Sequence, residues 1–289
     1  MRIITRSQSR KKIGRYNQNQ NESEGDGGDR ISDLPDSILL HIMSFMMIHD
    51  VIKTCILSTR WKNLWKSMPN IKLHTADFRN HCVFSEFISG IVSCRDGRGD
   101  GDHPLISLDF SRHGYLQNYI LTDLMRYVVS KDIQHLKIYV PYNLGLPSFV
   151  FSCSSLLSLD LSVSSYDLKR RTRISKPLEL PSLVSLRLES VAISVDENCQ
   201  AEPFSKCVKL KTLSINNFLM ISPDSDIDRS GTLVISNAKL ANLTIKEYKR
   251  YKILVSTPNL RSFTLDGSPF QQLRGKKGMA IELQSSSLA

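Results

Sequence analysis

The sequence has no apolar stretch long enough to cross a membrane. Its longest apolar run, residues 38–48, is interrupted by His41 and Ser44 and falls well short of the ~20 residues that a transmembrane helix needs. Residues 1–6 turn polar at once, so no secretory signal is expected there. We therefore expect an intracellular protein, in the nucleus or the cytoplasm, that is not embedded in a membrane.

Paired cysteines and metal-binding motifs are also missing. None of the six cysteines stands in C-x-x-C spacing, and no histidine pair lies near them at the spacing of zinc ligands. An intracellular chain keeps its cysteines as thiols, and Cys153 and Cys207 are expected to be small buried residues. The sequence therefore predicts neither a metal nor a cofactor.

A recognisable catalytic combination is absent as well. The seven histidines are scattered singly, and no nucleophile, base and orienting acid share a known local motif. His135 would project near Asp109 and Asp160 if the strands predicted below are adjacent, and it could then act as a base. Since no cysteine or oxyanion site joins it, we expect no catalytic residue and no enzymatic activity.

The formal charge of +10 is unevenly distributed. Residues 1–16 hold six basic residues and no acid, and residues 17–29 are polar, so 1–29 should be a disordered basic and polar head. Basic clusters return at 169–173 and 246–252 and favour an acidic partner surface. The second cluster includes two tyrosines, which leaves a basic nucleic-acid-binding protein as an alternative.

Residues 31–66 predict three short helices with more apolar surface than they can bury alone. Leu34-Pro35 opens the first helix, because proline is tolerated at the first helical position. This helix carries two apolar stripes with the same spacing, so it must be covered on two faces. The stripes are Ile38, Ile42, Phe45 and Leu39, Met43, Met46. Docking on a partner is therefore expected.

This segment closely resembles an F-box of the plant type, which ends in the run LSTRWKNLW at residues 57–65. The resemblance implies that it binds a Skp-type adaptor of cullin-RING ubiquitin ligases. The residues expected to contact the adaptor are Leu34, Pro35, Leu39, Val51, Cys55 and Trp61. Those expected in the core of the helical bundle are Ile38, Ile42, Phe45, Leu64 and Trp65.

An internal repeat follows the F-box-like segment. The pattern L-x-x-L-x-L, with apolar residues at the L positions, occurs seven times, and its copies begin 20 to 30 residues apart, the period of a leucine-rich repeat. The copies begin at Leu105, Ile133, Leu156, Leu183, Leu210, Leu240 and Leu260. Stripes at 84–91 and 116–128 predict helices between the first strands. The asparagine that normally links successive turns is replaced in every copy.

The predicted fold class is α/β: a three-helix F-box followed by an irregular leucine-rich-repeat solenoid with a curved parallel sheet. The expected domains are 1–29, the head; 30–75, the F-box; 76–265, the solenoid; and 266–289, a polar tail that should be disordered. Side chains alternate along a strand, so polar residues beside each central leucine should face the concave side. The residues expected to bind a target there are Asp109, His135, Lys137, Asp160, Arg187 and Asn242.

Together the two segments resemble plant F-box/leucine-rich-repeat proteins. Many of these carry a further FBD module, which is expected to be absent here. The resemblance implies a substrate receptor whose F-box binds the adaptor and whose repeats bind an unknown target protein. A protein-binding scaffold without ligase coupling stays open as the alternative.

Overall fold

The structure is a computed structural model that describes residues 31, 33–75, 78, 80–96, 104–112, 117–141, 145–164, 172–222, 231–246, 251–266 and 281–284. The chain forms two units, residues 1–35 and residues 36–289. The described part of the first unit is a turn in which the Leu34 N–H donates to the Ile31 carbonyl over 3.2 Å. The predicted disordered head lies outside the described residues.

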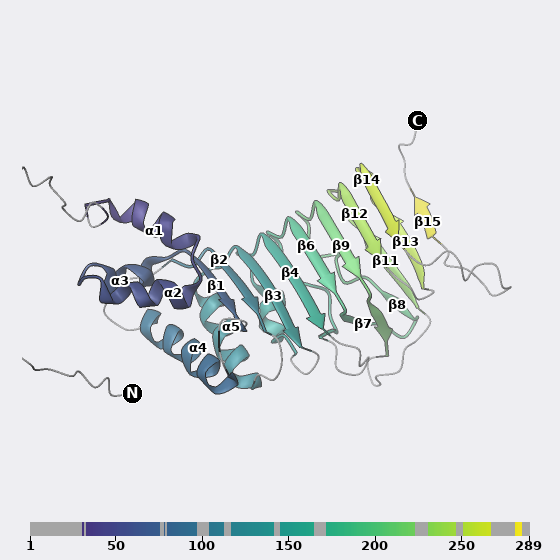
Figure 1. Ribbon diagram of the computed structural model, residues 1–289. Helices are drawn as coiled ribbons and strands as arrows, with labels where there is room; N and C mark the ends of the chain where they lie inside the picture. The colour runs from purple at the N-terminus through teal and green to yellow at the C-terminus, as the bar shows by residue number, and fades with distance from the viewer. Residues whose placement is uncertain are drawn as a thin grey trace, which may run out of the picture. The chain divides into compact units, whose positions relative to one another are not determined.

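The second unit begins with helices and continues into parallel strands (Figure 1). The helices are α1 (Asp36–Ser44), α2 (Ile48–Lys53), α3 (Trp61–Leu64), α4 (His81–Arg95) and α5 (Asn118–Ser130), with 3-10 turns η1 (Thr54–Ile56), η2 (Trp65–Ser67) and η4 (Ser148–Ser152). The main-sheet strands are β1 (Asn70–His74), β2 (Ser107–Ser111), β3 (His135–Pro141), β4 (Ser158–Ser164), β6 (Ser185–Glu189), β9 (Thr212–Asn216), β12 (Asn242–Lys246) and β14 (Ser262–Asp266).

The main sheet is parallel throughout, and its strands follow one another in chain order. All seven predicted repeat strands are present, which confirms the period and the phase of the pattern. Leu159, Leu186 and Leu213 are register partners on three successive strands and are buried, so the leucines stack into one continuous core as expected. The sheet also has a strand in addition to the seven predicted ones, β1, inside the segment predicted as F-box.

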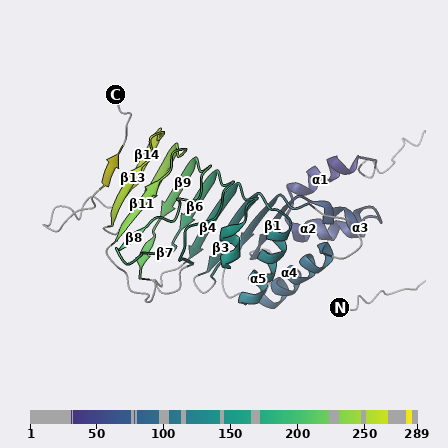
Figure 2. The same ribbon diagram turned by 180° about the vertical axis from the view of Figure 1, so that it is seen from behind.

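Helices cover only the first part of the unit (Figure 2). The predicted stripe on α4 is confirmed by the burial of Phe84, Ile88 and Ile91, and that on α5 by Ile120, Leu124 and Val128. Leu116, which was expected in the second stripe, lies outside the described residues. The helices pack against each other beside the first strands.

Further along the chain, the outer elements are strands where helices or loops were expected. One outer sheet contains β5 (Arg173–Ile174), β7 (Ala192–Ser194) and β10 (Leu219–Ile221), and the other contains β8 (Gln200–Ala201), β11 (Thr232–Ser236), β13 (Lys252–Ser256) and β15 (Ile281–Gln284). Within the predicted tail, residues 281–284 form β15, which pairs with β13.

Left-handed backbone turns lead from the main sheet to the outer strands. Ser190 and Asn217 have φ angles of 57° and 49°, and the Asn217 amide donates to the Ser190 hydroxyl over 3.1 Å. The asparagine position of the repeat is taken by Val191 and Phe218, which are fully buried. Packing of these side chains and pairing of β7 with β10 therefore stabilise this edge.

Cysteine and asparagine link the turns that precede the strands. The Cys207 thiol donates to the Leu178 carbonyl over 3.6 Å, and the Asn237 amide donates to the Cys207 carbonyl over 2.8 Å. Cys153 and Cys207 are buried free thiols, as expected. Burial raises the pKa of the Cys207 thiol to about 11.

Candidate protein-interaction surfaces

Helix α1 buries one of its two apolar stripes and exposes the other. Leu39 and Met43 are fully buried, whereas Ile38, Ile42 and Phe45 are 45%, 41% and 74% exposed. The prediction that Ile38, Ile42 and Phe45 belong to the bundle core is therefore wrong. The two stripes have the same helical period, so the periodicity could not decide which one packs against the rest of the unit.

Three residues expected at the adaptor contact are inside the bundle. Leu39, Val51 and Trp61 are buried, so they offer no free surface, and their expected position on the contact surface needs correction. Cys55 is half-buried, and its thiol lies 3.5 Å from the Lys62 carbonyl. Its pKa is raised by burial.

Of the other residues predicted in the F-box, two are buried as expected and two remain predicted adaptor contacts. Leu64 and Trp65 are buried, as expected for the bundle core. Leu34 and Pro35 belong to the first unit, and their contact with an adaptor stays a prediction.

Two further apolar side chains, which the sequence analysis did not select, are among the most exposed. Ile56 and Leu57, at the end of η1, are 88% and 63% exposed. We call Ile38, Ile42, Phe45, Ile56 and Leu57 the F-box apolar set. These five exposed side chains fall within twenty residues of the sequence, in the segment expected to bind the adaptor.

An ion pair fixes the start of α1 to the start of α3. Arg60 Nε donates to Asp36 Oδ1 over 2.8 Å, and the guanidinium forms a second bond to the same oxygen through Nη2. Asp36 is in the first turn of α1, where a negative charge is favourable. The arginine of the F-box-like run therefore links the start of α3 to the helix that carries Ile38 and Ile42.

A buried arginine joins the helical segment to the repeats. Arg95, at the end of α4, is fully buried. Its guanidinium donates to Tyr127 Oη over 2.9 Å, to the carbonyls of Met68 and Pro104 over 3.0 Å each, and to the Trp65 carbonyl over 3.3 Å. We call these four bonds the Arg95 clasp. They link η2, α5 and the segment before β2, so the end of the F-box and the first repeats form one body.

The strand register arranges the polar side chains of the main sheet into rows. Asp109, Lys137, Asp160 and Arg187 are direct neighbours on β2, β3, β4 and β6, and Lys72 on β1 extends the row at its other end. We call these five residues the charged row. Four of them were expected at the target site. Lys72 was not, because β1 lies within the segment predicted as F-box.

Ion pairs run along the charged row. Lys137 Nζ lies 3.3 Å from Asp109 Oδ2, and Arg187 Nε lies 3.7 Å from Asp160 Oδ1. His74 Nε2 lies 3.3 Å from the other oxygen of Asp109. Burial raises the pKa of Asp160, while Arg187 and Lys137 act in the opposite direction.

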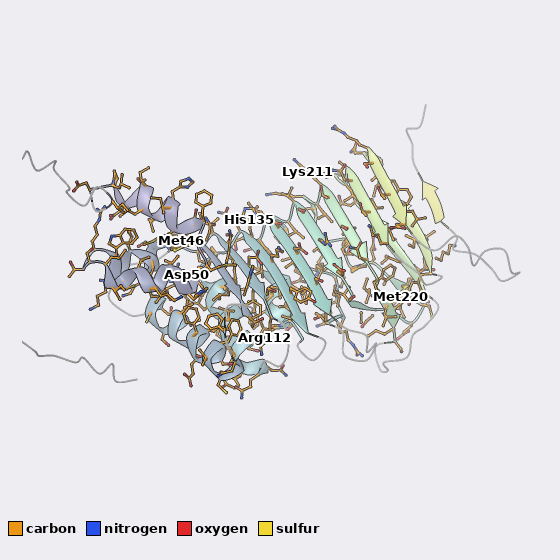
Figure 3. The ribbon with its side chains drawn as sticks, in the orientation of Figure 1. Met46, Asp50, Arg112, His135, Lys211 and Met220 are labelled. Carbon is orange, nitrogen blue, oxygen red and sulfur yellow. The ribbon has the colours of Figure 1, made fainter. Side chains whose placement is uncertain are left out.

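His135 lies at the start of β3 (Figure 3), and the register places it beside Ser107 and Ser158. The hypothesis of a base between two carboxylates required it to lie beside Asp109 and Asp160, which instead flank Lys137. Asn242 lies on the same row as His135, further along the sheet, and its amide donates to the Thr212 hydroxyl over 3.4 Å. Neither arrangement provides an activated nucleophile.

The described residues also include a cavity of about 350 Å³ at the outer strands. Its polar lining includes Lys176, Ser194, Asp196 and Glu202, and Asp196 accepts hydrogen bonds from the backbone N–H groups of residues 198 and 200. Among all the residues that the structure describes, no cluster of His, Cys, Asp or Glu could hold a metal ion. In the same set of residues, no helix is long and apolar enough to span a bilayer.

Two family models match the chain. The model described as "F-box domain" matches residues 31–73, and that described as "FBD-associated F-box protein At5g56370, LRR repeats" matches residues 121–286. The first includes the helical segment with the F-box apolar set, and the second includes the strands from β3 onward.

Curated relatives from Arabidopsis thaliana all have an F-box in their names, and two of the three given below also have leucine-rich repeats. "F-box/LRR-repeat protein 13" is 28% identical over 65% of this chain and 41% of its own length. "Putative F-box/FBD/LRR-repeat protein At1g66300" is 28% identical over 82% of this chain and 50% of its own. "FBD-associated F-box protein At4g13985" is 28% identical over 84% and 53%. The chain thus spans about half the length of these relatives, and no solved structure matches it.

Proposed function

The chain belongs to the family of FBD-associated F-box proteins with leucine-rich repeats, and from this membership we propose that it is a substrate-recognition subunit of a Skp–cullin–F-box ubiquitin ligase. The family is a non-catalytic adaptor family, so the associated cullin-RING and E2 components would transfer the ubiquitin. The F-box would bind a Skp-type adaptor, and the main sheet would bind a target protein inside the cell.

The exposure of the F-box apolar set is the observation that supports adaptor binding most directly. Ile42 on α1 and Phe45 directly after it are exposed, while Leu39 and Met43 on the opposite face of the helix pack inside the bundle. Apolar side chains of this size gain roughly 1.5–3 kcal/mol each when a partner buries them. We propose this set as the adaptor contact, together with Leu34, Pro35 and Cys55.

Binding of a purified Skp-type adaptor to the full chain tests the proposal. Ile42→Asp should weaken binding about tenfold or more, since a loss of 1.4 kcal/mol is a factor of ten. Asn63→Asp is the matched control, because it adds the same charge at an exposed position of α3 outside the apolar set. Equal adaptor binding by both variants would contradict the proposed contact surface.

Ubiquitin transfer separates the receptor from a scaffold without ligase coupling. A ligase reconstituted with the wild-type chain should modify proteins that co-purify with the repeats, and the Ile42→Asp variant should not support this reaction. If the adaptor binds but no co-purified protein is modified, the scaffold function is favoured.

A further inference from the structure

The charged row alternates in sign across five adjacent strands. Lys72, Lys137 and Arg187 occupy β1, β3 and β6, and Asp109 and Asp160 occupy β2 and β4 between them. Cations therefore recur on every second strand. Neighbouring strands are about 4.8 Å apart, so the cations are about 9.5 Å apart.

The cations reach further into solvent than the acids beside them. The side chains of Lys137 and Arg187 are 59% and 52% exposed, whereas those of Asp109 and Asp160 are 28% and 33% exposed. Lys72 is also exposed. Exposed ion pairs contribute little free energy, so the ammonium and guanidinium groups can exchange their partners. A molecule that approaches the sheet thus meets three positive groups, with half-buried Asp109 and Asp160 between them and Glu189 beside Arg187 at 3.2 Å.

From this spacing we infer that the charged row binds an acidic, extended segment of a target protein, with acidic side chains at every third residue. A polyproline II segment has three residues per turn and rises 3.1 Å per residue. Every third side chain of this helix lies on the same face, and successive side chains on that face are about 9.3 Å apart. This distance matches the spacing of the cations along the charged row. The inference rests on the proposed function, because it assigns a ligand class to the target-binding sheet.

Other extended or charged ligands match the row less well. A β-strand presents side chains on one face every ~6.6 Å, and an α-helix repeats after seven residues at ~10.5 Å. One strand of B-form DNA carries a phosphate every ~3.4 Å along its axis. A continuous line of charge would also lie against Asp109 and Asp160, which would repel it.

Two labelled peptides of equal composition test the inference by fluorescence anisotropy with the adaptor-bound full chain at low salt. One has Glu at positions 1, 4 and 7 separated by Pro and Ala, and the other has three adjacent Glu residues. The spaced peptide should bind about fivefold more tightly. Lys137→Glu should reduce this binding about fivefold or more, while Lys209→Glu, in the turn before β9, should not change it.

The remaining outcomes would overturn the inference. Both peptides could bind equally, or neither could bind. Alternatively, Lys137→Glu could leave the affinity for the spaced peptide unchanged, or a single-stranded oligonucleotide at the same charge concentration could displace that peptide. Adaptor binding is measured on the same samples. If it persists while the peptides fail, the ligand class is wrong and the proposed F-box function stands.

Discussion

Replacing Arg95 by methionine should destabilise the whole second unit. Methionine keeps most of the side-chain volume but removes all four bonds of the Arg95 clasp. Tyr127, Met68 and Trp65, which supply three of the acceptors, are themselves buried, and a buried acceptor without a donor costs about 1–3 kcal/mol. At the lower end of this range, the three acceptors together give a loss of about 3 kcal/mol in the free energy of unfolding. For a unit of this size, the midpoint of thermal unfolding should fall by about 6–12 °C.

The two tryptophans of the chain provide a local probe of this loss. Trp61 and Trp65 are buried, and the Trp65 carbonyl is one of the acceptors of Arg95. Urea denaturation can therefore be followed by tryptophan fluorescence for the F-box and by circular dichroism for the repeats. Because the clasp holds the two parts together, both signals should shift to lower urea in the variant.

Matched variants separate the clasp from a general effect of removing positive charge. Arg126→Met removes an exposed arginine of α5 that pairs with Asp123 over 2.7 Å, and it should change stability by no more than ~0.5 kcal/mol. The loss of stability in Arg95→Lys should lie between the losses in Arg95→Met and Arg126→Met, since lysine keeps the charge but lacks the planar guanidinium group. A loss below ~0.5 kcal/mol for Arg95→Met would refute the role assigned to the clasp.

The main sheet can be predicted well from the sequence because the apolar pattern of each repeat determines where its strand lies and which face is buried. In L-x-x-L-x-L, the last two apolar residues alternate with polar ones, so strand and buried face are decided together. The pattern at 70–74 also alternates, with Ile71 and Leu73 buried in β1, and buried Met68 occupies the first apolar position of the repeat, so this strand too could have been found from the sequence. Residues 232–236 and 252–256 each contain three consecutive apolar residues that include β-branched ones, and such short apolar runs could have identified the outer strands β11 and β13.

Contacts that depend on distant segments are not visible in any local pattern. Arg95 meets residues 65, 68, 104 and 127 only after the chain has folded, so the sequence shows nothing more than a basic residue at the end of a helix. The same limit applies to α1. Its two stripes are equivalent until the rest of the bundle covers one, so the sequence could not show that Leu39 is buried and Ile38 exposed.

Three shorter predictions concern the core, the thiols and the pH dependence of the charged row. Leu186→Asp should unfold the repeats, seen as loss of the circular dichroism signal, because it buries an unpaired charge; retention of a native signal would contradict the continuous core. Alkylation of the native chain at pH 8 should modify exposed Cys82 and spare Cys207, whose pKa is about 11; equal rates by mass spectrometry would contradict this. Burial raises the pKa of Asp160 in the folded chain, so the folded state holds this proton more tightly than the unfolded state. Stability relative to Asp160→Asn should therefore increase as pH falls through the folded pKa and decrease as pH rises, and urea midpoints of both proteins between pH 3 and pH 7 would show the opposite trend if the ion pair with Arg187 outweighed burial.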